Sequence, residues 1–329
     1  MPPSFAEAVH LVSSHSAAGW VLHAGAQRSR MLDTGECLTS GPCDVDPIRH
    51  EALRQAWYAE RGMPDSRYRL SLERLRAAIA GDEPVVLWGT RAYSDLVWLF
   101  WALDGLGRLG AGGPRFFLAR PWPADPLDTL GGMGPDEARR SLAAARPISD
   151  DEWREGAALW SQYASPSPLA FDESRRRGSS AFPELTTSAE LHGAWFPRLA
   201  DRRLRLSELD EVLLGGLGQS WIRFSDIAQM LPPDQLARLV RPFVAFFCVE
   251  RLRAWAAHGA VEYEPIADEN PYASDRFRAT ARTRTLIDHG LDGVGDAPPL
   301  HVGGCLVNDP ASPWVRLEAD SGWRLALHR

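Results

Sequence analysis

PVVLW, residues 84–88, is the clearest buried strand of the chain. A short apolar run bounded by turn residues is typical of a strand that is covered on both faces. It is followed by a helical pattern over 93–106 and by a further apolar strand, Phe116–Ala119. Upstream, Val9–Ser13 predicts a strand that leads into a helix over 17–26. Strands that alternate with helices predict an α/β fold with a mostly parallel sheet.

The pattern changes twice after this region. The predicted parts are a Rossmann-like α/β domain (1–130), a helical connector (131–203) and a C-terminal winged-helix-like domain (204–329). The connector begins where strand signals end, and it includes a helix expected over 181–197. The last part has short helices, a long helix over 234–258 and then two strands. That order is typical of a winged helix-turn-helix.

Composition excludes several functions. The chain has 329 residues, a formal net charge of −7 and 36 basic residues, all of them arginine. Without lysine there is no Walker A lysine and no Schiff-base lysine. The acidic balance argues against a broad basic surface for nucleic acid or an anionic membrane.

Localisation and metal binding are also constrained. The longest apolar run, Leu96–Leu103, is too short to span a bilayer, and the first ten residues lack the features of a signal peptide. These observations predict a cytoplasmic protein with no membrane partner. The four cysteines form no C-x-x-C pair and the histidines fit no zinc motif. No metal site is therefore predicted, and the sequence does not identify a cofactor, which is unknown.

The first candidate site is the turn Ser13, Ser14, His15 and Ser16, where the leading strand meets a helix. Free N–H groups and the helix dipole favour an anion at such a point, and ligands of open α/β sheets bind beyond the carboxyl ends of the strands. His15 adds a group that can transfer a proton. The alternative is that Ser14 or Ser16 only caps the helix.

The second candidate site follows the PVVLW strand. It comprises Trp88, Thr90, Arg91, Tyr93 and Asp95. In a parallel sheet this turn opens on the same edge as the first. We expect Arg91 to bind a carboxylate or phosphate with both guanidinium N–H groups, and Asp95 to orient His15 or Arg91. The alternative is a surface ion pair and an acid at a helix N-terminus.

The third candidate is the segment 36–44, which follows a strand expected within Met31–Leu38. Its Gly41-Pro42 turn is expected to carry Cys43 towards the same edge. Thiol catalysis needs a nearby base, and His15 and His50 are the candidates. A buried structural thiol is the alternative.

The long C-terminal helix raises the question of DNA binding. It carries both basic and aromatic side chains, namely Arg238, Arg241, Arg251, Arg253, Phe243, Phe246, Phe247 and Trp255. A recognition helix should be polar and basic on its exposed side, and this helix has too much apolar surface for that. We therefore expect it to pack against another domain or to form a homodimer through residues 204–329, with nucleic acid the weaker alternative.

The order of motifs resembles the bacterial proteins that carry the domain of unknown function number 1835. The motifs that carry the resemblance are His10-Leu11-Val12, Ser16-Ala17-Ala18, Gly41-Pro42, Leu87-Trp88 with Asp95, Phe182-Pro183, His192 and Phe196-Pro197. The resemblance covers most of the chain and implies the same fold, but no assigned activity. In the family the first turn carries Gly-Asp-Ser, whereas this chain has Ser14-His15-Ser16. The family also has Glu and Asp where this chain has Thr90 and Ala92, which implies altered or lost chemistry.

Three functions are consistent with these patterns. The first is a small-molecule enzyme of unassigned reaction that binds an anionic metabolite at the sheet edge, with His15 and Asp95 as its catalytic pair. The second is a ligand-responsive regulator whose winged-helix-like domain contacts DNA or a protein partner. The third is an accessory protein with a vestigial pocket.

Overall fold

The computed structural model describes residues 2–35, 37–61, 66–121, 132–230, 245–266, 274–319 and 322–328. The chain forms two compact units, unit 1 (Met1–Ser188) and unit 2 (Ala189–Arg329). These boundaries differ from those of the three predicted parts, since most of the expected connector belongs to unit 1. The functional division at 130 and 203 stays a prediction.

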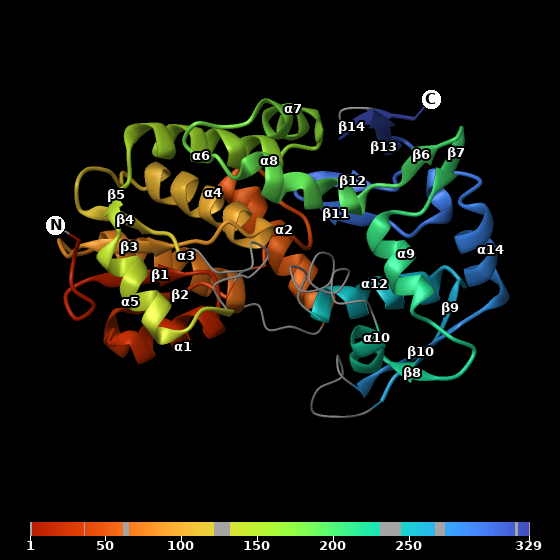
Figure 1. Cartoon of the computed structure of the whole chain (residues 1–329), viewed down its shortest axis with the longest axis horizontal. Helices are drawn as coiled ribbons and strands as arrows, with labels where there is room; N and C mark the ends of the chain where they lie inside the picture. Colours follow the sequence, from red (N-terminus) through yellow and green to blue (C-terminus); the bar gives the residue numbers. More distant parts are fainter. Residues whose placement is uncertain are drawn as a thin grey trace. The chain divides into compact units, whose positions relative to one another are not determined.

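Unit 1 is built around one mixed sheet (Figure 1). Its strands are β1 (Val9–Val12), β2 (Met31–Asp33), β3 (Val85–Trp88), β4 (Phe116–Ala119) and β5 (Arg146–Pro147). They lie in the order β2-β1-β3-β4-β5. The first four are parallel, and β5 is antiparallel to β4. The predicted α/β character and the partly parallel sheet are confirmed.

The order of the strands reverses at β1. His10 pairs with Met31 of β2 on one side and with Val86 of β3 on the other. The chain therefore leaves β1 in one direction to form β2 and returns past it to form β3. The carboxyl ends of β1 and β3 thus lie next to each other at the point of reversal.

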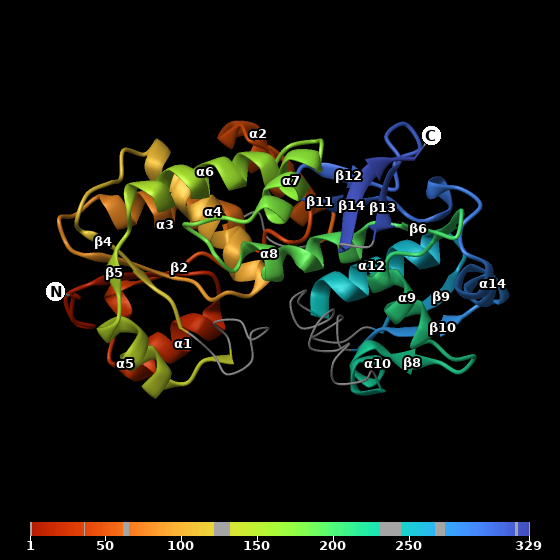
Figure 2. The same cartoon turned by 45° about the horizontal axis from the view of Figure 1, so that its top comes forward.

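Helices cover both faces of this sheet. Figure 2 shows α1 (His15–Ala24) and α5 (Pro135–Ala143) on one side, and α4 (Tyr93–Arg108) and α6 (Asp150–Tyr163) on the other. Alternate residues of the strands face the two layers, so Val12, Val86 and Trp88 join the core beneath α1 and α5. All four residues of β3 are buried, as the apolar run predicts.

The remaining helices of unit 1 lie between the strands or after them in the sequence. They are η1 (Arg28–Arg30), α2 (Pro47–Ala59), α3 (Ser66–Ile79), α7 (Leu169–Arg177) and α8 (Leu185–Ser188). In the described parts of the chain, no helix combines the length and apolar character that a membrane span needs.

Unit 2 contains several small sheets. One has the order β14-β13-β6-β7, from β6 (Arg198–Ala200), β7 (Arg203–Arg205), β13 (Trp314–Ala319) and β14 (Gly322–Leu327). Only β13 and β6 of this sheet run parallel. A separate hairpin joins β11 (Leu300–Val302) to β12 (Cys305–Val307).

The rest of unit 2 combines helices with a three-stranded antiparallel sheet of order β8-β10-β9. In chain order the elements are η3 (Ala189–Trp195), α9 (Glu208–Gly215), β8 (Ile222–Arg223), α10 (Phe224–Met230), α12 (Ala245–Ala257), β9 (Val261–Glu264), β10 (Arg276–Ala279), α14 (Ala281–His289) and η5 (Val294–Asp296). Of the helix expected over 234–258, α12 is the described part. Arg238, Arg241 and Phe243 lie outside the described residues.

Candidate functional site

The candidate turns follow the carboxyl ends of three neighbouring strands. Ser13 comes directly after β1, Gly89 directly after β3, and the segment with Gly41 lies between β2 and α2. Since β2, β1 and β3 are adjacent and parallel, these turns leave the sheet at one edge. This edge, next to the reversal between β1 and β3, is where ligands bind in open α/β sheets.

Asp95 joins the first two turns. It is 3% exposed and lies in the first turn of α4. The Ser13 hydroxyl donates to Asp95 Oδ1 at 3.2 Å, and the Thr90 hydroxyl donates to Oδ2 at 2.7 Å. Thr90 Oγ1 in turn accepts the Ala92 N–H at 3.1 Å. The carboxylate therefore fixes the turn after β1 to the turn after β3.

His15 has a different partner from the one we expected. Its Nδ1 lies against Asp33 Oδ2, at the end of β2, and the two groups form an ion pair when the imidazole is protonated. The His15 side chain is 85% exposed, whereas that of Asp33 is 12% exposed. Asp33 Oδ1 also accepts the Gly35 N–H at 2.8 Å. Asp33 is not among the residues predicted for the site; its position in the strand that follows the leading one is the signal that the sequence offers for it.

The capping role of Ser14 is observed. The Ala17 N–H donates to Ser14 Oγ at 3.3 Å, and Ser14 is the N-cap of α1. Ser16 is exposed on the first turn of the same helix. Arg91 is half-buried, and its carbonyl accepts a hydrogen bond from the Ser188 hydroxyl. A ligand-binding role for these residues stays a prediction.

Thr34 holds the ends of β1 and β2 together. Its hydroxyl donates to the Val12 carbonyl at 3.2 Å and accepts from the Trp98 indole at 2.9 Å. Thr34 is buried, so this bond network lies in the core beneath the edge. These hydrogen bonds of Thr34 also hold the backbone of Asp33 in place, because Asp33 is the preceding residue in the chain.

Trp88 and Tyr93 are buried core residues. Trp88 donates from its indole to His10 Nδ1 at 3.1 Å, and His10 Nε2 lies 3.1 Å from the Phe5 carbonyl. Burial lowers the pKa of His10, so the imidazole stays neutral. Burial likewise raises the pKa of Tyr93, whose ring meets that of Tyr163 edge to face. Trp88 and Tyr93, which were predicted to bind the ligand, therefore lie in the core next to the turns of this edge.

Cys43 is also buried, and its thiol lies 3.7 Å from the Leu38 carbonyl. The two histidines that were predicted as candidate bases for this thiol contact other groups. His15 faces Asp33, and His50 Nδ1 accepts the Asp44 N–H at 3.1 Å. These contacts agree with the alternative of a structural thiol, and a ligand-binding role for Cys43 stays a prediction.

His50 gives unit 1 a pH dependence. Burial and the charge of Arg54 lower its pKa to about 3, against about 6.5 in the unfolded chain. The unfolded state therefore takes up a proton below about pH 6.5 while the folded state does not, and stability falls as the pH drops from about 6.5 towards 3. At about 1.4 kcal/mol per pH unit, the loss between pH 7 and pH 5 should be roughly 2 kcal/mol.

Urea unfolding at pH 7, 6 and 5 measures this loss. H50N keeps an acceptor for the Asp44 N–H but cannot titrate, so its stability should fall less between pH 7 and pH 5. H23N, at the exposed His23, should keep the wild-type pH profile. Equal profiles for wild type and H50N would contradict the assignment.

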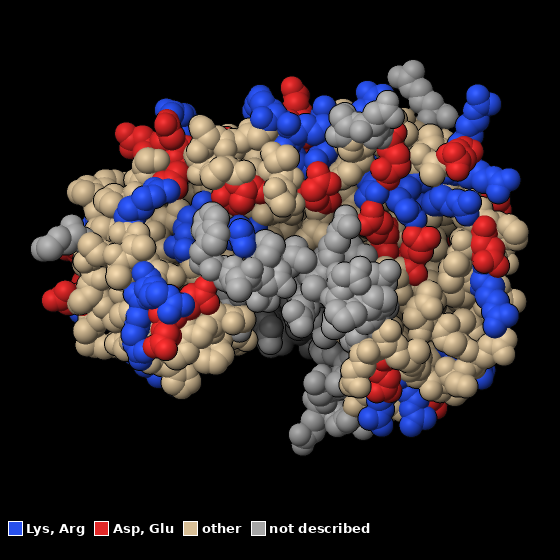
Figure 3. Space-filling view, viewed as in Figure 1, with Lys and Arg blue, Asp and Glu red and all other residues tan. Residues whose placement is uncertain are grey.

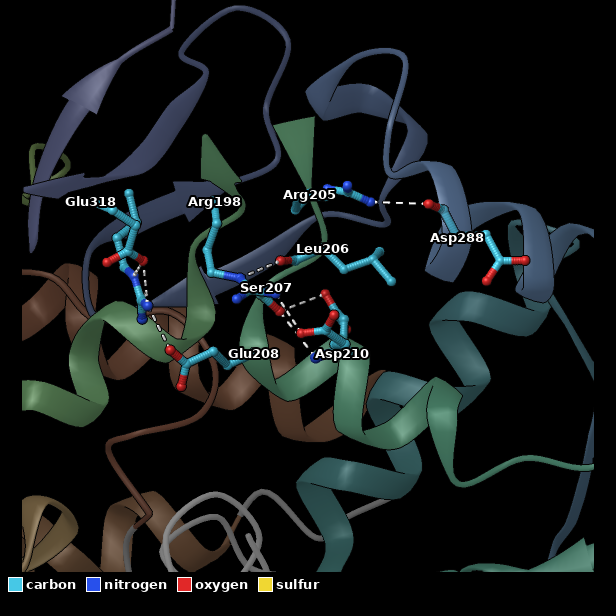
Figure 4. Close-up of polar contacts among 10 residues, drawn as sticks. Arg198, Arg205, Leu206, Ser207, Glu208, Asp210, Asp288 and Glu318 are labelled. Carbon is cyan, nitrogen blue, oxygen red and sulfur yellow. Dashed lines mark hydrogen bonds and ion pairs between the residues drawn. The ribbon is translucent and has the colours of Figure 1, made fainter. Parts of the chain in front are cut away.

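The two described arginines of α12 in unit 2 bind carboxylates, so they are poorly placed to bind the phosphates of DNA. Arg251 is 2% exposed and donates to Asp210 Oδ1 at 2.6 Å and to Oδ2 at 2.7 Å. Arg253 donates to Glu250 at 2.6 Å and also binds Asp275. Figure 4 shows Asp210 beside Ser207 at the start of α9. Both described arginines of α12 are therefore engaged by carboxylates.

Two aromatic side chains of α12, Phe247 and Trp255, are covered within unit 2. Trp255 is fully buried, and Phe247 packs edge to face on Trp195 with ring centroids 4.5 Å apart. The apolar surface of Phe247 and Trp255, which suggested a homodimer, thus packs inside unit 2. A homodimer stays a prediction.

The charged surface and the potential metal ligands add few constraints on the function. Figure 3 shows arginine and acidic side chains interspersed over the face in view. Among the residues with described positions, no group of three or more His, Cys, Asp and Glu side chains is placed to hold a metal ion.

Neither a scan against protein-family models nor a search of curated proteins returns a match for this chain. The resemblance to the family with domain 1835 therefore stays a prediction.

Proposed function

We propose that unit 1 is a Rossmann-like domain of an enzyme that binds a small anionic metabolite at the carboxyl edge of β1 and β3. The order β2-β1-β3-β4 supports this proposal, because it reverses at β1 as it does in doubly wound nucleotide-binding folds. A distant relationship to the family with domain 1835 is part of the same proposal, with Ser14-His15-Ser16 and Thr90 as departures from that family.

The observation that carries the proposal is the position of His15. Its exposed imidazole lies at the N-terminus of α1, directly beyond the carboxyl end of β1, and Asp33 faces one of its ring nitrogens. An accessible histidine next to a carboxylate is suited to proton transfer. A purely structural edge has no need for that pair, since Ser14 already caps the helix.

The charges of the two helix N-termini favour an anion near α1 over one near α4. The buried Asp95 carboxylate lies in the first turn of α4 and takes up the favourable potential of that N-terminus. The first turn of α1 contains no acidic residue of its own, although the Asp33 carboxylate of β2 lies against His15 there. Arg91, on the neighbouring turn, supplies the clamp for a carboxylate or phosphate.

A thermal-shift panel tests the proposal. The probes are inorganic phosphate, pyrophosphate, citrate and the common nucleotides, each up to millimolar concentration. One of them should stabilise the wild type by about 2.7 kcal/mol when its concentration reaches 100 times its Kd. H15A and R91A should each weaken that ligand at least about tenfold, which corresponds to 1.4 kcal/mol.

The matched control is H23A, because His23 is an exposed histidine at the other end of the same helix. It should bind the ligand as the wild type does. If no anion shifts the wild type, or if H15A and H23A bind equally well, the proposed site is wrong.

The second candidate is a ligand-responsive regulator. We propose a winged-helix-like domain in unit 2, and the succession α9, β8, α10, α12, β9, β10 with the antiparallel order β8-β10-β9 supports it. The engaged arginines of α12 favour a protein partner over DNA. A gel shift with random duplex at low salt separates these alternatives, because retardation that disappears with added salt supports DNA binding.

A further inference from the structure

We infer that Asp33 is the positioning residue for His15 and that together they form a His–Asp pair whose outward nitrogen, Nε2, acts as the general base of the site. The inference rests on the proposed function, and it replaces Asp95 by Asp33 as the partner of His15. It also narrows the substrate to an anionic molecule whose O–H group, or the water that attacks it, loses a proton in the reaction.

The two carboxylates at this edge are in different situations. Asp95 is buried and accepts hydrogen bonds from Ser13 and Thr90, so its contacts join the two turns. Asp33 directs Oδ2 at His15 Nδ1, while its Oδ1 is held by the Gly35 N–H. Of these two carboxylates, Asp33 is the one that lies against His15 Nδ1, where it selects which nitrogen of the imidazole carries the proton.

The pair determines the direction of proton transfer. A carboxylate beside Nδ1 favours the tautomer with the proton on Nδ1, which leaves the lone pair on Nε2. Since the His15 side chain is 85% exposed, this nitrogen is accessible to a bound substrate. An O–H proton moves to Nε2, the resulting imidazolium is stabilised by ionised Asp33, and the proton later returns to the product or to water.

Stability does not account for this arrangement. An ion pair with one highly exposed partner contributes at most about 1 kcal/mol to folding. Its main physical consequence is the fixed orientation and tautomer of the ring. This resembles the way a carboxylate orients the general base in hydrolytic triads.

Nuclear magnetic resonance of the full chain labelled with ¹⁵N-histidine tests the inference without a substrate. Long-range ¹⁵N–¹H correlations, assigned by the loss of signals in H15Q, should show the Nδ1–H tautomer as the major neutral form of His15. D33A should shift the major form to Nε2–H, the preference of free histidine, and D33E should restore Nδ1–H. A structural role alone would not produce that pattern.

The outcomes separate the two proposals. An Nε2–H majority in the wild type, or an unchanged tautomer in D33A, overturns the inference even if an anion binds. The expected tautomers without any anion binding support the His–Asp pair and contradict the proposed function. The wild-type spectrum decides the first point even if D33A fails to fold.

Discussion

Replacing Asp210 by alanine should lower the free energy of unfolding of unit 2 by about 3–5 kcal/mol, because it leaves a buried arginine without its counter-charge. The side chains of Arg251 and Asp210 are 1% and 2% exposed. Arg251 binds both carboxylate oxygens, and the Trp255 indole donates to Oδ1 at 2.7 Å. The Ser207 hydroxyl adds a bond to Oδ2 at 2.9 Å. The substitution therefore removes the acceptor of Arg251 and Trp255 on α12 and of Ser207, the N-cap of α9.

Peptide-resolved hydrogen exchange in urea measures the effect in unit 2. The matched control is E262A, which breaks the exposed pair between Glu262 and Arg278 on neighbouring strands and should cost less than about 1 kcal/mol. The double variant D210L/R251M should recover much of the loss, since it removes both charges together. If D210A costs no more than E262A, the network does not hold unit 2 together.

Local patterns predicted the main features of unit 1 correctly. The PVVLW run is a strand buried along its whole length, and the alternation of strands and helices gives a partly parallel sheet. The order of the strands could not be predicted in the same way. It depends on the direction in which the chain crosses the sheet after β2, and no short pattern encodes that direction.

Distant contacts fix the bounds of two expected elements. The strand expected within Met31–Leu38 is β2, which ends at Asp33, and the next residue, Thr34, binds Val12 and Trp98. The helix expected over 181–197 is instead α8 followed by η3. A Cβ on Gly193 would meet the Trp323 ring at 2.5 Å. That close approach involves a residue far along the chain, which helical periodicity cannot reveal.

The candidate site shows the same limit. His15 and Asp95 were identified because turns after strands are natural ligand sites, but their partners were not. Ser13 and Asp95 are 82 positions apart, and Asp33 lies at the end of β2, away from His15 in the sequence. Burial was the other unpredictable factor, since Trp88 and Tyr93 lie near the edge in sequence but inside the core in space.

The segment after β2 provides the second large prediction, through Arg54. This arginine of α2 is fully buried, and its guanidinium lies 4.8 Å from the Trp57 ring centroid. It donates to the carbonyls of Cys37 and Ser40 and to the Tyr58 hydroxyl. Gly41 lies against this group with a φ of +79°. The turn is thus wrapped closely around a buried cation.

G41A should destabilise unit 1 by about 2–4 kcal/mol. The left-handed backbone accounts for about 1–2 kcal/mol with any residue other than glycine. The rest comes from overlap, because an added Cβ would meet Arg54 Nη1 at 2.6 Å and the Trp57 ring at 2.7 Å. Moving the guanidinium weakens hydrogen bonds of buried carbonyls, each of which contributes about 1–3 kcal/mol when lost.

G110A separates the two causes. Gly110 also has a positive φ, +85°, but an added Cβ there would meet nothing within 4 Å. Urea unfolding of the two variants should therefore show only the backbone cost for G110A and a clearly larger loss for G41A. Because the overlap displaces Arg54, peptides covering 37–43 should also exchange faster in G41A under native conditions. Equal losses of stability in the two variants would mean that the turn accommodates the methyl group and that Arg54 does not fix it.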